Sequence, residues 1–144
     1  SDAALFKMET NMTPAASAKR MEMGTPHVLT MGPMLAALRM FEETSIHALR
    51  QRSLELTSYL IEQIDTKLDG GGFSIATPRD EARRGGHVAL RHARSEQLVP
   101  HLAERKIVTD FRHPDICRVA PVAMYNDHAD IDAFVDAVYE WSDQ

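Results

Sequence analysis

The sequence has a single cysteine, no long apolar run and no excess of basic residues, and each shortage excludes a class of protein. Cys117 alone cannot form a disulfide within the chain, which fits the reducing cytoplasm. No window approaches the roughly 20 apolar residues of a membrane-spanning helix, and the N-terminus lacks the basic-then-apolar order of a signal peptide. Sixteen Lys and Arg against 21 Asp and Glu give a net charge of −5, so nothing indicates nucleic acid or an anionic membrane as a partner. We expect a cytoplasmic protein.

The rest of the composition is that of a globular protein. The 144 residues are 44% hydrophobic and 26% charged, which suits one domain with its own core. The chain begins at Ser1 instead of Met and enters an irregular, Met-rich stretch. We therefore expect a segment of a longer protein.

Two helices are predicted in the first half. Gly24-Thr25-Pro26 is typical of a turn, and Pro33 suits the first turn of a helix, where its missing N–H costs little. Ser45 suits the N-cap of a long amphipathic helix over 46–68, which Gly70-Gly71-Gly72 ends. Apolar residues at helical spacing mark the inner side of this helix: Ile46, Leu49, Leu56, Leu60, Ile64 and Leu68.

The second half has shorter elements. Alternating or apolar runs predict four strands, over 73–76, 87–91, 107–111 and 116–119. Two further helices are predicted over 95–106 and 130–141. This order indicates an α+β fold, a small antiparallel sheet with helices on one face.

Common catalytic and metal-binding motifs are absent. Seven histidines suggest a metal site, but no His-Glu-x-x-His, Cys-x-x-Cys or carboxylate cluster accompanies them. His87 and His92 are predicted at the two ends of one strand, on opposite faces. Cys117 is predicted to be buried and inert, because Arg118 beside it points to the other face of its strand. We expect no metal site and no Ser-His-Asp set.

Two short segments retain a functional interpretation beside a structural one. The Gly24-Thr25-Pro26 turn offers backbone N–H groups and a hydroxyl ahead of a helix, which suits an anion such as phosphate, although an ordinary loop has the same pattern. Arg112 and Arg118 flank a turn between two strands. A strand arginine usually lies at the surface, whereas one aimed into a cleft would bind a carboxylate with its fork of N–H groups.

Several motifs together resemble the later part of the kynureninase family. They are Phe6-Lys7-Met8, Gly24-Thr25-Pro26, the helix with Arg50-Gln51-Arg52-Ser53-Leu54-Glu55-Leu56-Thr57, Thr77-Pro78, Arg84-Gly85-Gly86-His87-Val88, Asp110-Phe111-Arg112 and Arg118-Val119-Ala120-Pro121-Val122-Ala123-Met124-Tyr125-Asn126. That family belongs to the pyridoxal-phosphate enzymes of aminotransferase class V and fold type I. The resemblance implies hydrolysis of L-kynurenine to anthranilate and L-alanine in tryptophan catabolism, by a homodimer that carries pyridoxal 5'-phosphate.

The resemblance also assigns roles to individual residues. It places Arg118 on the arginine that grips the substrate carboxylate, and Thr25, with Gly24, on the turn that reaches the cofactor phosphate from the neighbouring subunit. The Gly24-Thr25 pair looks like the bacterial form that prefers kynurenine to its 3-hydroxy derivative. Arg112, Tyr125 and Asn126 lie in matching motifs, and we expect structural roles for them.

The family's cofactor lysine has no counterpart here. Lys7, Lys19, Lys67 and Lys106 match no such motif, so the resemblance implies that this lysine lies upstream and that the segment has no catalytic residue. It further implies a remnant of the large domain in 1–45, a connecting helix in 46–70 and a small α+β domain in 71–144. We expect no turnover from these 144 residues alone.

Two alternatives stay open from the sequence. Cysteine desulfurases and selenocysteine lyases share the class but need a catalytic cysteine on a mobile loop, and Cys117 is predicted inside a strand. A stand-alone, non-catalytic α+β binding module is the other alternative.

Overall fold

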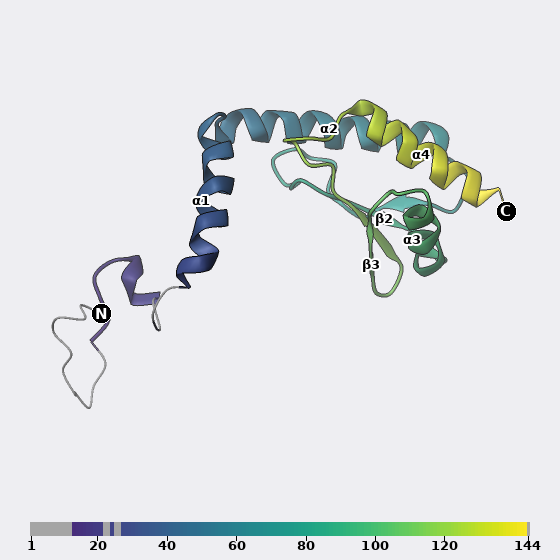
Figure 1. Cartoon of the computed structure of the whole chain (residues 1–144). Coiled ribbons are helices and arrows are strands. Elements are labelled where there is room, and N and C mark those ends of the chain that lie inside the picture. The colour runs from purple at the N-terminus through teal and green to yellow at the C-terminus, as the bar shows by residue number, and fades with distance from the viewer. Residues whose placement is uncertain (1–12, 22–23, 25–26, 144) are drawn as a thin grey trace. The chain divides into compact units, whose positions relative to one another are not determined.

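The computed structural model describes residues 13–21, 24 and 27–143. The chain separates into two compact units, Ser1–Glu43 and Thr44–Gln144. Figure 1 shows the elements of each unit in chain order. Each unit is described by itself below.

The first unit contains a short 3-10 helix, η2 (Ala18–Met21), and the helix α1 (Val28–Glu42). The sequence placed Pro33 in the first turn of this helix, and that prediction is wrong, because the helix already begins at Val28 and Pro33 lies inside it. The earlier start is stabilised by Thr30, whose backbone N–H and side-chain hydroxyl both donate to the carbonyl of His27. No described residue of this unit is buried.

The second unit begins with the long helix α2 (Ile46–Lys67), as predicted. The Ser45 hydroxyl caps its N-terminus by accepting a 3.1 Å hydrogen bond from the N–H of Ala48. Beyond its end, Gly70 and Gly72 adopt positive φ angles of 80° and 77°, which glycine takes without steric cost. From its middle onward it supplies buried apolar core residues: Leu56, Leu60, Ile61 and Ile64. Ile46 is 76% exposed, so its predicted place on the inner side is wrong: it lies in the first turn, ahead of the packed part of the helix.

The strands β1 (Ser74–Ile75), β2 (Val88–Arg91), β3 (Asp110–Arg112) and β4 (Ile116–Val119) form one antiparallel sheet in the order β1-β2-β4-β3. The predicted strand over 107–111 is wrong at its start, because pairing begins only at Asp110. After the preceding helix the chain turns at Lys106, with a φ of 64°, and leaves Val108 93% exposed.

The helices α3 (Ser95–Glu104) and α4 (His128–Ser142) complete an α+β domain, which confirms the predicted fold class. In Figure 1, α2 and α4 lie side by side over the sheet, and the two helices are in contact. The sheet residues that alternate toward the helices are buried, and those between them are not. The buried set is Val88, Leu90, Cys117 and Val119.

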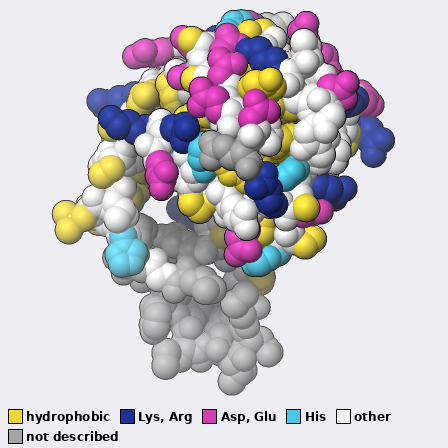
Figure 2. All heavy atoms as spheres, turned by 90° about the vertical axis from the view of Figure 1, so that its right-hand side faces the viewer, with side chains coloured by type: hydrophobic (Ala, Val, Ile, Leu, Met, Phe, Trp, Pro, Cys, Tyr) yellow, Lys and Arg dark blue, Asp and Glu magenta, His cyan; other side chains and the backbone are white. Residues whose placement is uncertain are grey.

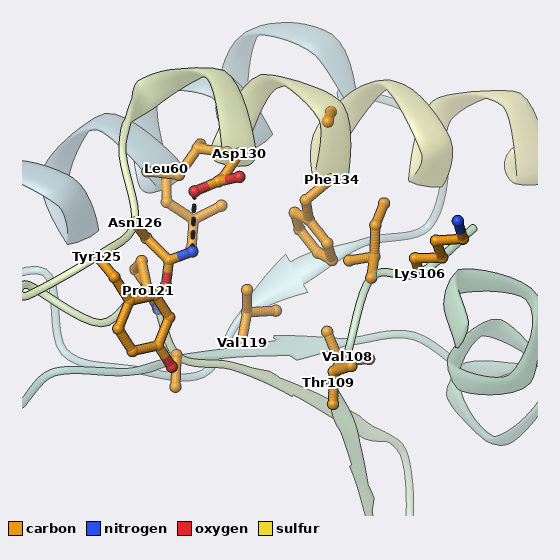
Figure 3. Close-up of a pocket in the computed structure, with 14 residues that line it drawn as sticks. Leu60, Lys106, Val108, Thr109, Val119, Pro121, Tyr125, Asn126, Asp130 and Phe134 are labelled. Atoms are coloured by element: carbon orange, nitrogen blue, oxygen red, sulfur yellow. Dashed lines mark hydrogen bonds between the residues drawn. The ribbon is translucent and has the colours of Figure 1, made fainter. Parts of the chain in front are cut away.

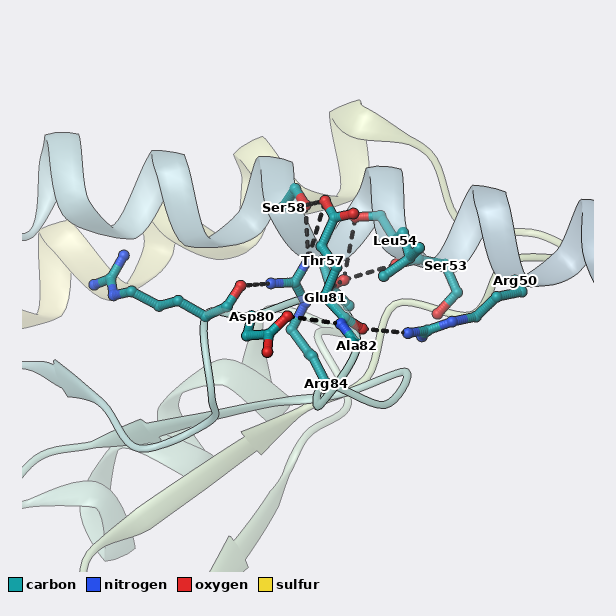
Figure 4. Close-up of polar contacts among 10 residues, drawn as sticks. Arg50, Ser53, Leu54, Thr57, Ser58, Asp80, Glu81, Ala82 and Arg84 are labelled. Carbon is teal, nitrogen blue, oxygen red and sulfur yellow. Dashed lines mark hydrogen bonds and ion pairs between the residues drawn. The ribbon is translucent and has the colours of Figure 1, made fainter.

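The loop between β1 and β2 is held on α2 by a buried arginine (Figure 4). Arg84 is only 4% exposed and donates three hydrogen bonds. Its acceptors are the Thr57 hydroxyl at 3.1 Å, the Ser58 hydroxyl at 2.7 Å and the Arg79 carbonyl at 2.8 Å. This cluster fixes the Arg84-Gly85-Gly86 turn and therefore the start of β2.

Candidate functional site

Arg118 lies in the middle of β4, on the face of the sheet that the helices leave uncovered. Its neighbours in β4, Cys117 and Val119, point into the core, so alternation turns Arg118 outward. The residues opposite it across the ladder are Ala89 in β2 and Asp110 in β3. The side chain is 40% exposed, so an approaching molecule can reach it.

Asp110 joins two arginines on this face. Its Oδ1 accepts a 2.8 Å hydrogen bond from Arg118 Nε, and its Oδ2 forms a 2.6 Å ion pair with Arg112 Nη2. The hydrogen bond from Arg118, and the nearby charge of Arg112, hold the pKa of Asp110 below its usual value. The three ionised side chains therefore leave one net positive charge on this face of the sheet.

Arg118 keeps part of its donor capacity free. Its only side-chain hydrogen bond within the described part of the chain uses Nε. The two terminal nitrogens form the planar fork with which arginine binds carboxylates and phosphates bidentately. The arrangement can thus hold an anion on the outer face of the sheet.

The predicted phosphate turn is described only at Gly24. Thr25 and Pro26 lie outside the described residues. Gly24 is exposed, and no described atom lies within 4 Å of the point that a Cβ at this position would occupy.

Asn126 has the structural contacts expected of it. Its Oδ1 accepts from the N–H of Val122 at 2.8 Å, and its Nδ2 donates to Asp130 Oδ2 at 2.9 Å, which ties the turn after β4 to the start of α4. Tyr125 is 75% exposed. Arg112 forms its ion pair with Asp110 at the sheet edge.

An open groove of about 450 Å³ lies on the helix side of the sheet (Figure 3). Leu60, Val119 and Phe134 form apolar parts of its lining, and Tyr125 and Asp130 add polar groups. Arg118 is not among the lining residues. The side chain of Arg118 therefore does not line this groove.

Cys117 is fully buried in β4, as predicted. Burial raises the pKa of its thiol, which disfavours the reactive thiolate form. The placement of two histidines was wrong, because His87 precedes β2 and His92 follows it. His92 instead stacks on Phe73, with ring centroids 4.4 Å apart, and meets the edge of Trp141.

The pairing of Asp110 with Arg118 is the part of the site that sequence reasoning missed. A signal existed: in a hairpin centred near Pro114, the positions 110 and 118 lie at equal distances from the centre, as do 112 and 116. The observed register pairs both sets. Reading this symmetry would have placed the acid opposite the arginine.

The exposed charges are mixed. Figure 2 shows one face of the molecule, on which Lys and Arg side chains are interspersed with Asp and Glu side chains. Within the described residues, no helix has the length and apolar character that crossing a membrane requires.

Comparison with known proteins identifies the family. Residues 49–138 match the family model of the kynureninase C-terminal domain. Over 126 residues the chain is 39% identical to kynureninase of Geobacillus thermodenitrificans and 38% identical to that of Bacillus mycoides, in each case 88% of this chain and 29% of the relative. Kynureninase of Shouchella clausii is 40% identical over 121 residues, 84% of this chain and 28% of the relative. The chain thus spans less than a third of the length of these relatives, and it belongs to the kynureninase family as a C-terminal portion.

Proposed function

We propose that this chain is the C-terminal part of a pyridoxal-phosphate-dependent hydrolase that cleaves L-kynurenine to anthranilate and L-alanine. Membership of the kynureninase family supports the reaction, because relatives named kynureninase match 88% of the chain. The single structural observation behind the role of this segment is the outward-facing Arg118, whose two terminal nitrogens have no hydrogen-bond partner among the described residues. Its chemistry suits a substrate that carries an α-carboxylate.

Arg118 binds and orients the substrate in this proposal. A bidentate contact between its two terminal nitrogens and the carboxylate fixes the position and plane of that substituent of the Cα atom in space. The cofactor, when bound, supplies the electron sink that this carbon–carbon cleavage requires. Gly24 and Thr25 contribute a contact to the cofactor phosphate from the neighbouring subunit of a homodimer.

The remaining organisation follows from the family. Residues 1–45 belong to the large domain, 46–70 to the connecting helix and 71–144 to the small domain. The cofactor lysine lies outside this segment, so the 144 residues alone have no turnover. The complete protein acts in the cytoplasm, in tryptophan catabolism, and the Gly24-Thr25 pair favours kynurenine over its 3-hydroxy derivative.

The cysteine-dependent enzymes of the same class fit less well. Their chemistry needs an accessible thiolate, whereas Cys117 is buried and the pKa of its thiol is raised. A stand-alone binding module remains the second alternative from a different class. A complete reading frame without a cofactor-lysine domain would support it.

The test is the substitution Arg118→Ala in the enzyme encoded by the complete reading frame. A bidentate, charge-assisted contact with the substrate carboxylate contributes about 1.5–3 kcal/mol, so its loss lowers kcat/KM by at least about tenfold. Anthranilate fluorescence measures the rate, with sulfide release as the assay for the competing activity. Unchanged kcat/KM would contradict the role of Arg118.

Arg91→Ala is the matched control. Arg91 lies on the same outer face, in β2, and pairs with Asp115 at 3.3 Å. Its removal changes the charge of the face by the same amount without touching Arg118. We expect kcat/KM of this variant to stay within about threefold of the unmodified enzyme, since surface pairs contribute little.

A further inference from the structure

We propose that Asp110 is a positioning residue for substrate binding, which holds the Nε edge of the Arg118 guanidinium so that its two terminal nitrogens face the substrate carboxylate. This inference rests on the proposed function, because it needs Arg118 as the carboxylate-binding group. It adds a residue to which the family resemblance gave no role.

The sheet register makes Asp110 a fixed support. Asp110 and Arg118 are directly opposite residues of the antiparallel pair β3–β4, on the same face. Side chains in such positions meet without any change in the backbone. The 2.8 Å bond from Nε to Oδ1 therefore anchors a long side chain that is otherwise free to rotate at the surface.

The position of this bond on the guanidinium is what matters. Arginine has five N–H donors in one plane. Asp110 engages the single N–H of Nε, so the end of the plane that carries Nη1 and Nη2 points away from the acid. An incoming carboxylate can bind this end in a fork-to-fork arrangement while Asp110 stays in place.

Arg112 completes the arrangement by balancing the charge of Asp110. The 2.6 Å pair between Arg112 Nη2 and Asp110 Oδ2 satisfies the second carboxylate oxygen. Without it, the Asp110–Arg118 pair would be neutral overall and would attract an anion weakly. With it, the three groups carry one net positive charge. The pKa of Asp110 is lowered, so the acid is ionised when the substrate binds at neutral pH.

Two other roles of Asp110 would explain the same contacts, and each predicts a different effect of its removal on carboxylate recognition. Asp110 could serve only the stability of the hairpin, or it could compete with the substrate and have to be displaced. A stabilising role leaves carboxylate recognition unchanged after removal of Asp110. A competing role makes recognition stronger.

The experiment measures recognition of the carboxylate alone. In the complete enzyme loaded with its cofactor, calorimetry gives the dissociation constants of L-alanine and of L-alaninamide, which lacks the carboxylate. The dissociation constant of L-alaninamide divided by that of L-alanine reports the carboxylate contact. This ratio is insensitive to a general loss of binding, which affects both ligands. We expect Asp110→Ala to reduce this ratio about tenfold, because Arg118 loses its anchor.

Asp110→Asn removes the negative charge at position 110 but keeps a hydrogen-bond acceptor for Arg118. The amide oxygen of asparagine still accepts the hydrogen bond from Arg118 Nε, so we expect the ratio to stay within about threefold of the unmodified enzyme. Asp115→Ala, which removes the acid of the neighbouring Arg91–Asp115 pair, is the control and should leave the ratio unchanged. If Asp110→Ala does not fold, Asp110→Thr replaces it, because threonine suits a strand and its hydroxyl is shorter than the carboxyl.

Each other outcome overturns the inference. An unchanged ratio in Asp110→Ala leaves only the stabilising role, and an increased ratio leaves the competing one. Equal losses in Asp110→Asn and Asp110→Ala would show that a hydrogen-bond acceptor at position 110 is not sufficient to anchor Arg118. Arg118→Ala tells the two proposals apart. If Arg118→Ala lowers the ratio to about one while Asp110→Ala does not change it, only the positioning role of Asp110 fails. If Arg118→Ala keeps the ratio, the proposed function of Arg118 itself fails.

Discussion

Two arginines of the second unit have opposite environments and correspondingly different roles. Arg118 lies on the uncovered face of the sheet with an acidic partner and keeps donors available. Arg84 is buried, and oxygens from α2 and from its own loop satisfy its donors. Since a buried polar group is costly without partners, the Arg84 cluster holds the loop in one position.

At the residue scale, we expect Arg84→Ala to destabilise the protein by about 2–4 kcal/mol. The variant loses hydrogen bonds from a charged donor and leaves the Thr57 and Ser58 hydroxyls short of a partner. Urea unfolding followed by circular dichroism measures the free energy of unfolding. Arg83→Ala is the control, because Arg83 is exposed in the same loop and its removal should cost less than about 0.5 kcal/mol. Equal stability of the two variants would contradict the role of the buried guanidinium.

At the scale of elements, the start of α4 shows how local sequence defines a helix boundary. Asp127 and Asp130 form a capping box, in which each carboxylate accepts from the backbone N–H of the other residue at 3.1 Å. Hydrogen bonds from the Asn126 side chain and the Asp127 backbone lower the pKa of Asp130. The ionised Asp130 therefore stabilises α4 at neutral pH, and this contribution disappears as the pH falls through the lowered pKa.

We expect Asp127→Ala to lower the free energy of unfolding by about 1 kcal/mol, because an N-cap side chain satisfies a helix N–H that has no other partner. Asp143→Ala, at the other end of α4, is the matched control. Removing an acid from a helix C-terminus is neutral or slightly stabilising. Chemical unfolding of both variants measures the difference. A cost for Asp143→Ala as large as that for Asp127→Ala would mean that general charge, and not the cap, is responsible.

The elements also differ in how far the sequence predicted them. The helix α2 was predicted almost to the residue, because its cap, its apolar spacing and its terminal glycines are all local signals. The strand β3 was predicted three residues too early, since Ile107 and Val108 are apolar but have no ladder partner. Pairing partners of a strand come from distant parts of the chain, so local composition does not fix where a ladder begins.

At the scale of the whole molecule, the core belongs to one unit only. Every residue of the hydrophobic core cluster comes after Thr44. The helix α1 has no buried residue, although most of its side chains are apolar. The exposed large apolar residues of α1 are Val28, Leu29, Met31, Met34, Leu35, Leu38, Met40 and Phe41. Such a surface favours association with other protein.

We expect residues 44–144, produced without the first 43, to fold with a free energy of unfolding within about 1 kcal/mol of that of the whole chain. The reason is that no core residue is removed, and changes away from the core have small effects. Circular dichroism and urea unfolding test the stability, and sedimentation velocity tests association. The shortened chain should also associate less than the 144-residue chain. An unfolded 44–144 segment would show that the first unit is needed for the core.

The sequence by itself determined the family, the α+β class, the Ser45 cap and terminal glycines of α2, and the outward direction of Arg118. These depend on residue type, on spacing along one element, and on alternation within one strand. Only the tertiary structure decided that Asp110 lies against Arg118 and that Arg84 is buried against α2. It also decided that Arg118 does not line the groove in Figure 3. The physical reason is that these contacts join different elements, and they arise from sheet register and helix packing, which no single segment of the sequence specifies.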